Sequence, residues 1–400
     1  MPIFDQGYQH WKGELAGHAW RWLAITQQGM RTGMKNRILR YLVACSALPA
    51  ILLTFVLALW GLVERKTESI MGLAEGIVGF FPFLNRSILL DPVQYRGMVW
   101  TLSYNLFLSI ELFLSMVAVL LVGPSLISQD LRFNAIPLYL SRPVRRIDYF
   151  FGKLGVIGYF LSMTIIAPSL LAWFCGLLFS LDITLIRDTY LILLSAVGFG
   201  LLVVFSAGLL MLALSSLSRR SLYVGIAWLA IWFISGITGT ALEGASQSER
   251  AMRRYRYQSQ KMAQTNRPPN APGQIVGPGQ GPVPQRGHGP GGPGMFPPAG
   301  QDPAEQELID EEMAYARKDW RPLFSYTANL SRVGKVLLDT DTAWKKLADF
   351  IPPGPQREYF LLENLGYQYP WYWSGGILAG LMGISVCILN FRVKSLDRLR

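Results

Sequence analysis

The sequence predicts an all-α integral membrane protein with six transmembrane helices and both termini in the cytoplasm. Its composition is the first reason: 51% of the 400 residues are hydrophobic and only 16% are charged, too few polar side chains to cover a soluble protein of this size. The second is the presence of six long apolar runs. The third is the uneven distribution of Lys and Arg between the segments that connect these runs.

Each apolar run is long enough to cross a bilayer core of roughly 30 Å, which takes about 20 helical residues. The runs cover residues 41–63, 102–127, 154–181, 189–217, 222–242 and 371–391. The first begins after 40 residues and is too long for the core of a signal peptide, so we expect an uncleaved anchor. All three cysteines fall inside these runs, which leaves none in the loops for a disulfide framework or a thiolate metal site.

The basic residues set the expected orientation. With the amino terminus inside, 17 Lys and Arg residues are cytoplasmic and 5 lie in the two short outer loops. Another 15 lie in the long segment 243–370, which counts little because long loops are translocated largely regardless of charge. The net charge of +11 therefore needs only anionic lipid and an orientation signal as its explanation, and we expect no nucleic acid partner.

Four parts of the chain are expected. Residues 1–40 form a cytoplasmic tail in which 18–37, with two tryptophans and several cations, predicts a helix in the membrane interface, or else an ordinary basic tail. Residues 41–242 hold helices one to five and a cytoplasmic loop at 128–153. Residues 243–370 form an extracytoplasmic segment, and 371–400 hold the sixth helix and a basic tail.

The extracytoplasmic segment is not uniform. Residues 268–303 contain 11 prolines and 10 glycines without a three-residue period, a composition that cannot bury a core and predicts disorder. The start of a helix over about 303–318 is predicted by three residues. Asp302 suits the N-cap, Pro303 the first helical position, and Glu305 the acidic position that can accept a hydrogen bond from the N-cap amide. A second short helix is expected at 342–350.

The loop 128–153 combines prolines, aromatic residues and paired charges. Such a loop suits a stiff and specific contact with a soluble partner. A loop that rests on lipid headgroups is the alternative, and the residue types alone do not choose between the two. The residues expected at the contact are Asp130, Arg132, Tyr139, Arg142, Pro143, Arg145, Arg146, Asp148, Tyr149 and Lys153.

Three stretches of this loop carry a family resemblance: Asp130-Leu131-Arg132, Tyr139-Leu140-Ser141-Arg142-Pro143, and Asp148-Tyr149-Phe150-Phe151-Gly152-Lys153. Together with Gly123-Pro124, they resemble the loop between the second and third spans in ATP-binding-cassette (ABC) transporter permeases of the type 2 class. The resemblance covers residues 18–242 and 320–400. The insert at 268–303 departs from the family pattern and weakens any inference about substrate.

The resemblance implies the membrane permease subunit of an ATP-driven transporter, with export as the expected direction and the bacterial inner membrane as the expected location. It also implies two partners: an ABC ATPase subunit on the 128–153 loop, and a second permease subunit, expected to be a copy of this chain. ATP and Mg would bind the ATPase, and this chain would bind no cofactor. The outer segment could contact an envelope partner.

Missing motifs fit a non-catalytic subunit. The chain has no Gly-x-x-x-x-Gly-Lys-Ser/Thr phosphate loop, and its three histidines are isolated, with no partner at metal-ligand spacing. We therefore expect neither ATP hydrolysis nor a metal site on this polypeptide.

Glu111 is the one ionisable residue well inside an expected span, and burial of a charge in a membrane is costly. It is therefore a candidate intramembrane polar site with a role in substrate binding or gating. Its expected place in the outer half of the second span leaves an alternative, in which the carboxylate reaches water or a helix dipole.

Two other functions remain open. One is a non-transporting ABC-type membrane complex that relays ATPase motion to an envelope partner through the outer segment. The other is an ion-coupled secondary transporter, which the lack of an inverted repeat and of several intramembrane ionisable residues disfavours.

Overall fold

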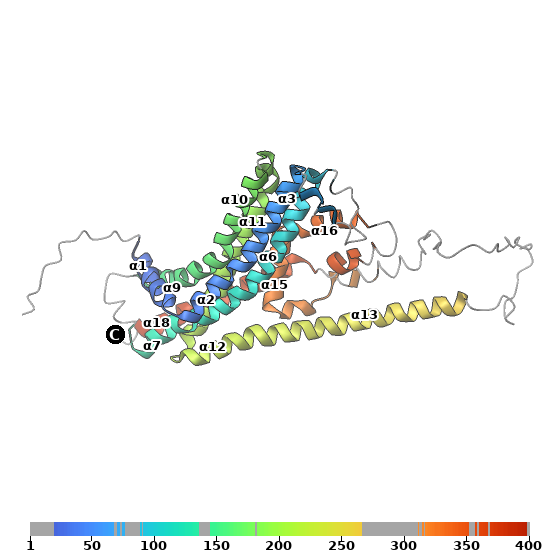
Figure 1. Ribbon diagram of the computed structural model, residues 1–400. Coiled ribbons are helices and arrows are strands. Elements are labelled where there is room, and N and C mark those ends of the chain that lie inside the picture. Colours follow the sequence, from blue (N-terminus) through green and yellow to red (C-terminus); the bar gives the residue numbers. More distant parts are fainter. Residues whose placement is uncertain are drawn as a thin grey trace, which may run out of the picture.

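The described part of the chain is a helical bundle in which no residue forms a strand. Figure 1 shows the computed structural model. It describes residues 20–67, 70–72, 74–76, 89, 91–135, 145–180, 182–265, 311, 314–315, 317–351, 357, 360–366 and 369–397. The segment 268–303, expected to be disordered, lies outside these residues, as do residues 1–19 and most of the helix expected at 303–318.

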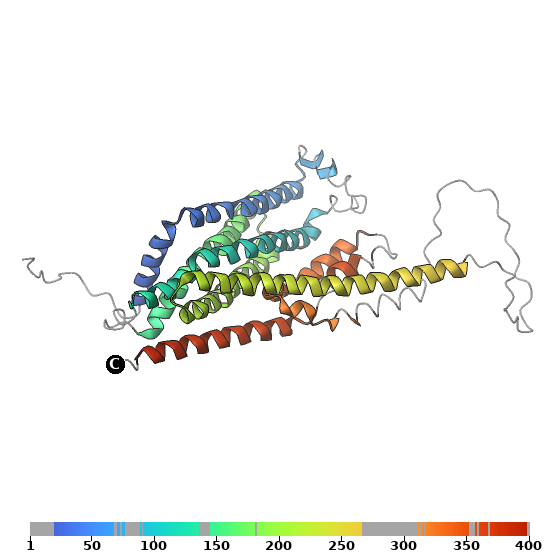
Figure 2. The same cartoon turned by 90° about the horizontal axis from the view of Figure 1, so that it is seen from below.

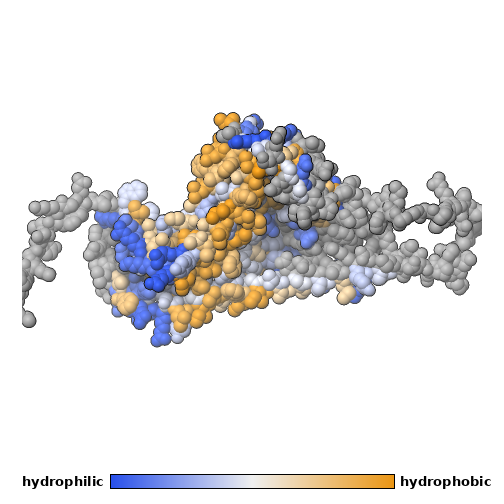
Figure 3. All heavy atoms as spheres, viewed as in Figure 1, coloured by the Kyte–Doolittle hydropathy of each residue, from blue (hydrophilic) through white to orange (hydrophobic). Residues whose placement is uncertain are grey.

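Among the described residues, six helical stretches are long and apolar enough to cross a membrane, as many as the sequence predicts and as expected of a multi-pass membrane protein. They cover Arg37–Glu64, Pro92–Arg132, Arg146–Ser180, Thr184–Leu217, Ser221–Leu242 and Trp371–Arg392. Figure 3 shows apolar side chains over the middle of the bundle, between hydrophilic residues at its ends. The helix α1 and the carboxyl end of α18 lie at the same end of the bundle (Figures 1 and 2).

Several spans consist of more than one helix. The first span is α2 (Arg37–Cys45) followed by α3 (Ala47–Glu64), and the second is α6 (Pro92–Val122) followed by α7 (Pro124–Arg132). The third and fifth spans each contain a π-helical segment: the third is α9 (Arg146–Leu161), η2 (Ser162–Ile166) and α10 (Ala167–Ser180), and the fifth is α12 (Ser221–Leu229), η3 (Ala230–Ile234) and the start of α13 (Ser235–Thr265). The fourth span is the single helix α11 (Thr184–Leu217), and the sixth is the single helix α18 (Trp371–Asp397).

Local sequence explains where these helices begin and bend. The Asn36 side chain caps α2 by accepting a hydrogen bond from the Ile38 amide at 3.0 Å. Prolines occupy the first turns of α6 and α7, where a helix needs no amide hydrogen. Pro168 has no amide hydrogen to donate one turn back, and η2 directly precedes it.

The helix α11 is central to the bundle. It packs against α6, α7, α9, α10 and α18, and Ala196, Val203, Ala207, Met211 and Leu212 along it are almost fully buried. Gly200 and Gly208 let α11 approach the third span closely, because a Cβ at either position would lie within 2.7 Å of Ile166 or Leu154. In lipid, helices gain no hydrophobic stabilisation by associating, so the close van der Waals packing that these glycines allow stabilises the contact instead.

The segment after the fifth span contains more helix than expected. The helix α13 does not end near Leu242 but continues to Thr265 and projects past the bundle (Figures 1 and 2). A short helix, α15 (Tyr326–Leu337), was not expected at all; it packs against α11 and α18. Beside it, α16 (Thr340–Ala348) occupies the stretch where a helix was expected at 342–350.

Candidate functional site

Both edges of the expected cytoplasmic loop are helical in the structure. Asp130 and Arg132 belong to the end of α7, and Arg146, Asp148, Tyr149 and Lys153 belong to the start of α9. The helices therefore extend into polar sequence on both sides of residues 136–144, which lie outside the described part of the chain. Tyr139, Arg142 and Pro143 lie outside the described residues.

Three of the expected contact residues face inward and join α7 to α9. The Lys153 ammonium lies 2.6 Å from the Asp130 carboxylate, and the Tyr149 hydroxyl donates a hydrogen bond to the same carboxylate oxygen at 2.7 Å. The side chains of Lys153 and Asp130 are only 11% and 15% exposed, and Tyr149 is buried. We call these three residues the Asp130–Tyr149–Lys153 group; in the structure they bond to one another across α7 and α9.

Other members of the expected set are exposed. Arg132 and Arg145 are exposed, as are Phe133 and Ile147, which present 71% and 65% of their surface. Arg146 and Asp148 are half-buried, and Asp148 accepts a hydrogen bond from the Arg145 amide at 3.1 Å, which caps α9. We call Arg132, Phe133, Arg145 and Ile147 the α7–α9 edge; it combines two cations with two large apolar side chains.

The backbone at this edge has a defined ending. Asn134 has a φ of 51°, a left-handed conformation that asparagine tolerates better than most residues. The Phe133 amide donates to the Gln129 carbonyl, and the Ala135 amide donates to the Asp130 carbonyl. These bonds close the last turn of α7 and fix the point at which the chain leaves it.

The helix α7 is held on α11 by one hydroxyl group. The Ser215 Oγ accepts hydrogen bonds from the Ile127 and Ser128 amides at 3.1 and 3.0 Å and donates to the Pro124 carbonyl at 3.0 Å. The Ser215 hydroxyl thus bridges the Ile127 and Ser128 amides and the Pro124 carbonyl, which lies one turn before Ser128 in α7. Displacement of α7 would therefore move α11 or break three hydrogen bonds.

The helix α1 (Arg21–Met34) lies where the interfacial helix was expected, and it packs tightly on α9. Thr26 Oγ1 donates to the Gly152 carbonyl at 3.0 Å. A Cβ on Gly29 would lie 2.3 Å from Val156, and one on Gly152 would lie 2.7 Å from Ile25. Glycine on both helices thus sets the separation between them.

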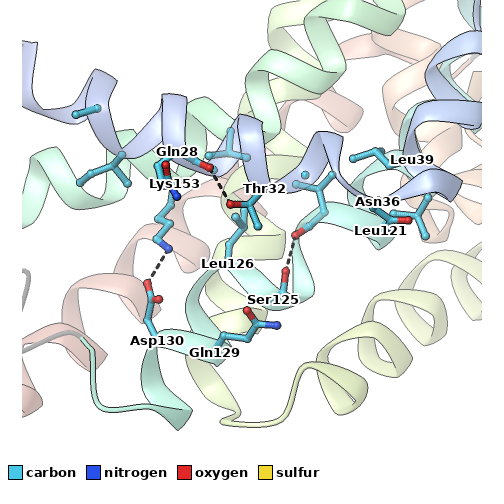
Figure 4. A pocket seen from close by; sticks show the side chains of 16 residues that line it. Gln28, Thr32, Asn36, Leu39, Leu121, Ser125, Leu126, Gln129, Asp130 and Lys153 are labelled. Carbon is cyan, nitrogen blue, oxygen red and sulfur yellow. Dashed lines mark hydrogen bonds and ion pairs between the residues drawn. The ribbon is translucent and has the colours of Figure 1, made fainter.

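A cleft of about 440 Å³ opens between α1, α6, α7 and α9 (Figure 4). Gln28 and Thr32 come from α1, Gln129 and Asp130 from α7, and Lys153 from α9. The cleft has a mixed apolar and polar lining, and its charged residues, Asp130 and Lys153, are paired with each other. Movement of α1 or α7 would change its shape.

Removing the Lys153 charge is expected to destabilise this end of the bundle. Lys153→Met leaves the half-buried Asp130 carboxylate with a tyrosine hydroxyl and no cation, at a cost of about 1–3 kcal/mol in the free energy of unfolding. Thermal unfolding in detergent measures the loss, with exposed Lys346→Met as the control. The double variant Asp130→Asn/Lys153→Met should recover part of the loss, and a purely additive double variant would contradict the coupling.

The opposite end of the bundle holds a charged group that the sequence did not reveal. Arg96 is 1% exposed and donates two hydrogen bonds to Glu64, at 2.9 and 2.8 Å. It also donates to Asp182 at 2.9 Å, and to Asp188 and Thr184 at 3.1 Å. This Arg96 cluster joins α3, α6 and α11, and the Ser180 hydroxyl of α10 adds a bond to Glu64.

The cluster contains one cation and three carboxylates. Glu64 is 4% exposed, whereas Asp182 and Asp188 are 38% and 44% exposed and rely partly on water. A hydrogen bond from the Thr184 hydroxyl, followed by the one from Arg96, lowers the pKa of Asp182 to about 2. The arginine was expected in an outer loop, because the apolar run begins only at Leu102.

Glu111 does not reach water, which corrects one of the two alternatives for this residue. It is 0% exposed, and neither carboxylate oxygen has a hydrogen-bond partner among the described residues. The nearest turn of α6 toward α7 carries Ser115, whose hydroxyl is already bonded to Thr164 at 3.2 Å.

No protein-family model, no curated protein and no solved structure matches this chain.

Proposed function

We propose that this chain is the permease subunit of an ATP-driven ABC transporter, with ATP and Mg bound by a separate ATPase subunit. The α7–α9 edge is the observation that carries the proposal. It offers exposed cations and apolar side chains for a partner, and the Asp130–Tyr149–Lys153 group and Ser215 link it to three spans. A push on this edge would therefore reach the bundle directly.

The proposed arrangement places this edge and both termini in the cytoplasm of a bacterial cell, with two copies of the chain forming the pathway. The 17-to-5 distribution of Lys and Arg supports the orientation. Export is proposed as the direction because the loop resembles that of type 2 permeases. Phosphate chemistry would belong wholly to the ATPase.

Capture of an ATPase tests the proposal. The full chain, purified in mild detergent with a candidate ABC ATPase from the same organism, should retain it. The variant Arg132→Glu/Arg142→Glu/Arg145→Glu should lose at least about tenfold in ATPase capture, because the reversed charges repel a partner that accepts cations.

A matched control uses the exposed Arg219 and Arg220, which lie in the short turn between α11 and α12. Arg219→Glu/Arg220→Glu reverses two arginine charges instead of three and should keep the ATPase. Both variants must elute as the intact chain does in size-exclusion chromatography. Equal capture by all three proteins, or no capture by the intact chain, would overturn the proposal.

A second candidate function has one observation in its favour. The 23 residues of α13 beyond Leu242 extend roughly 35 Å as a single helix, which is long enough to contact a component outside the membrane. A non-transporting complex that relays ATPase motion to an envelope partner would use such a helix. Deleting residues 244–320 would then remove partner binding and leave ATPase capture intact, whereas a transporter would show substrate flux coupled to ATP hydrolysis.

A further inference from the structure

Glu111 is a buried acid that the proposed coupling mechanism does not use. It lies on α6, 15 residues after Arg96 and 19 residues before Asp130, which places it roughly 22 and 28 Å along the helix from the two charged groups. Both of those groups are internally paired. Glu111 thus lies in the middle of the bundle, far from either cation.

Among the described residues, the helices packed on α6 supply no hydrogen-bond partner to Glu111. One cation, Lys335 of α15, lies at about this depth, in a small pocket that Leu108 and Leu112 of α6 also line. The helix α3 has no titratable group before Glu64, α11 has none between Tyr190 and its end at Leu217, and η2 has none. Further titratable groups on neighbouring helices are Asp341, Lys345 and Lys346 on α16, Arg37, Arg40 and Tyr41 on α2, and Tyr159 on α9; none of them is a hydrogen-bond partner of Glu111.

The remaining groups come from α6 itself, α12 and α15. Tyr104 donates its hydroxyl to the Ser169 carbonyl, and the Tyr326 hydroxyl pairs with Ser206 at 2.7 Å. Arg332 donates to the Tyr369 carbonyl at 2.9 Å, Lys335 has other interactions, and Tyr223 of α12 is exposed. None of these groups forms a hydrogen bond or ion pair with Glu111 among the described residues.

Among the described residues, an ionised carboxylate in this position would have no exposure to solvent and no hydrogen-bond donor to stabilise it. Its burial in that form would cost several kcal/mol, whereas the neutral acid avoids most of that cost. We propose that Glu111 is a proton-binding site in the membrane core. It holds its proton in the packed arrangement and releases it to water in any arrangement that exposes this face of α6.

The proton site gives the chain a pH-dependent conformational equilibrium that does not depend on the identity of the ATPase. In a transport cycle, the site would load a proton when the bundle closes and release it when water or a cationic ligand reaches α6. The ATPase-capture experiment can therefore fail while the proton site stands, and the reverse also holds.

Infrared spectroscopy of the full chain in lipid nanodiscs tests the protonation state directly. At pH 7 the wild type should show the C=O stretch of a protonated carboxylic acid, and Glu111→Gln should remove it. Glu75→Gln removes an exposed carboxylate and should leave the band unchanged. A wild-type spectrum without the band at pH 7 would overturn the proposal.

The pH dependence of unfolding provides the second readout, with the sign set by proton linkage. The folded state keeps the proton while the unfolded state loses it as the pH rises, so wild-type stability should fall relative to Glu111→Gln. Above the ordinary titration range of glutamate, the ratio of their unfolding constants should change by about tenfold per pH unit.

Glutamine has the shape of the neutral acid, so at pH 5 the variant should fold and unfold at about the temperature of the wild type. Parallel pH profiles, or a glutamine variant that does not fold, would show that the carboxylate is ionised and would overturn the site.

Discussion

Replacing Arg96 with methionine is expected to lower the free energy of unfolding by about 3–5 kcal/mol, because Glu64 would stay buried without an opposite charge. Asp182 and Asp188 would lose the same cation, although their exposure limits that part of the cost. Denaturant unfolding in mixed micelles, followed by tryptophan fluorescence, measures the loss. The Arg187→Met control removes an exposed arginine of α11 and should change stability by less than about 1 kcal/mol.

A double variant separates the charge pair from simple packing. Arg96→Met/Glu64→Leu replaces both partners with apolar side chains and should recover much of the stability lost by Arg96→Met alone. If the double variant is no more stable than the single variant, the unpaired charge of Glu64 is not the source of the loss.

Acid should remove the contribution of Asp182 to stability only at low pH. Because the pKa of Asp182 is depressed to about 2, its contribution is present above the ordinary pKa of aspartate and is lost as the pH falls toward 2. The pH dependence expected for Glu111 is the opposite, because its contribution to the free energy of unfolding declines as the pH rises.

Adding one methyl group to Gly152 is expected to separate α1 from α9. The Cβ of Gly152→Ala would lie 2.7 Å from the Ile25 Cβ and 3.0 Å from the Trp22 carbonyl oxygen, neither of which is the end of a flexible side chain. Overpacking of this kind costs about 1–3 kcal/mol. The change would also move Thr26 away from the Gly152 carbonyl, so amide hydrogen exchange in α1 should become faster.

Gly198→Ala is the matched control. Gly198 lies within a span on α11, and a Cβ there would meet nothing within 4 Å. Hydrogen exchange in α1 should be unchanged in this variant. Equal protection of α1 in Gly152→Ala and in the wild type would show that α1 does not depend on the close approach.

The spans could be predicted from sequence because each depends on a local property, a run of about 20 apolar residues. The Arg96 cluster could not be predicted in this way. Its members are separated by up to 124 positions, and the polar first turns of α6 resemble a loop until their partners on α3 and α11 are known. The aspartates at 182 and 188 gave no signal beyond the ordinary composition of a short outer loop.

The candidate coupling loop shows the same limit more clearly. Its residue types were informative, but the division between the inward Tyr149 and Lys153 and the outward Arg145 and Ile147 depends on the helical register of α9. Glu111 was visible in the sequence as a charge within a span. Its complete burial depends on which neighbours surround α6, which a single sequence does not specify.

Hydrogen bonds and ion pairs join neighbouring helices at both ends of the bundle. The Arg96 cluster joins the second span to α3, α10 and α11 at one end, and Ser215 and the Asp130–Tyr149–Lys153 group join α7, α9 and α11 at the other. A helix held at both ends cannot tilt as a rigid rod, so it changes shape by flexing along its length. The π-helical segment η2 lies midway along the third span, which both end groups hold, and its backbone hydrogen bonding is already irregular. We therefore expect covalent cross-links across either end to restrict this span less than a substitution that makes η2 a regular α-helix.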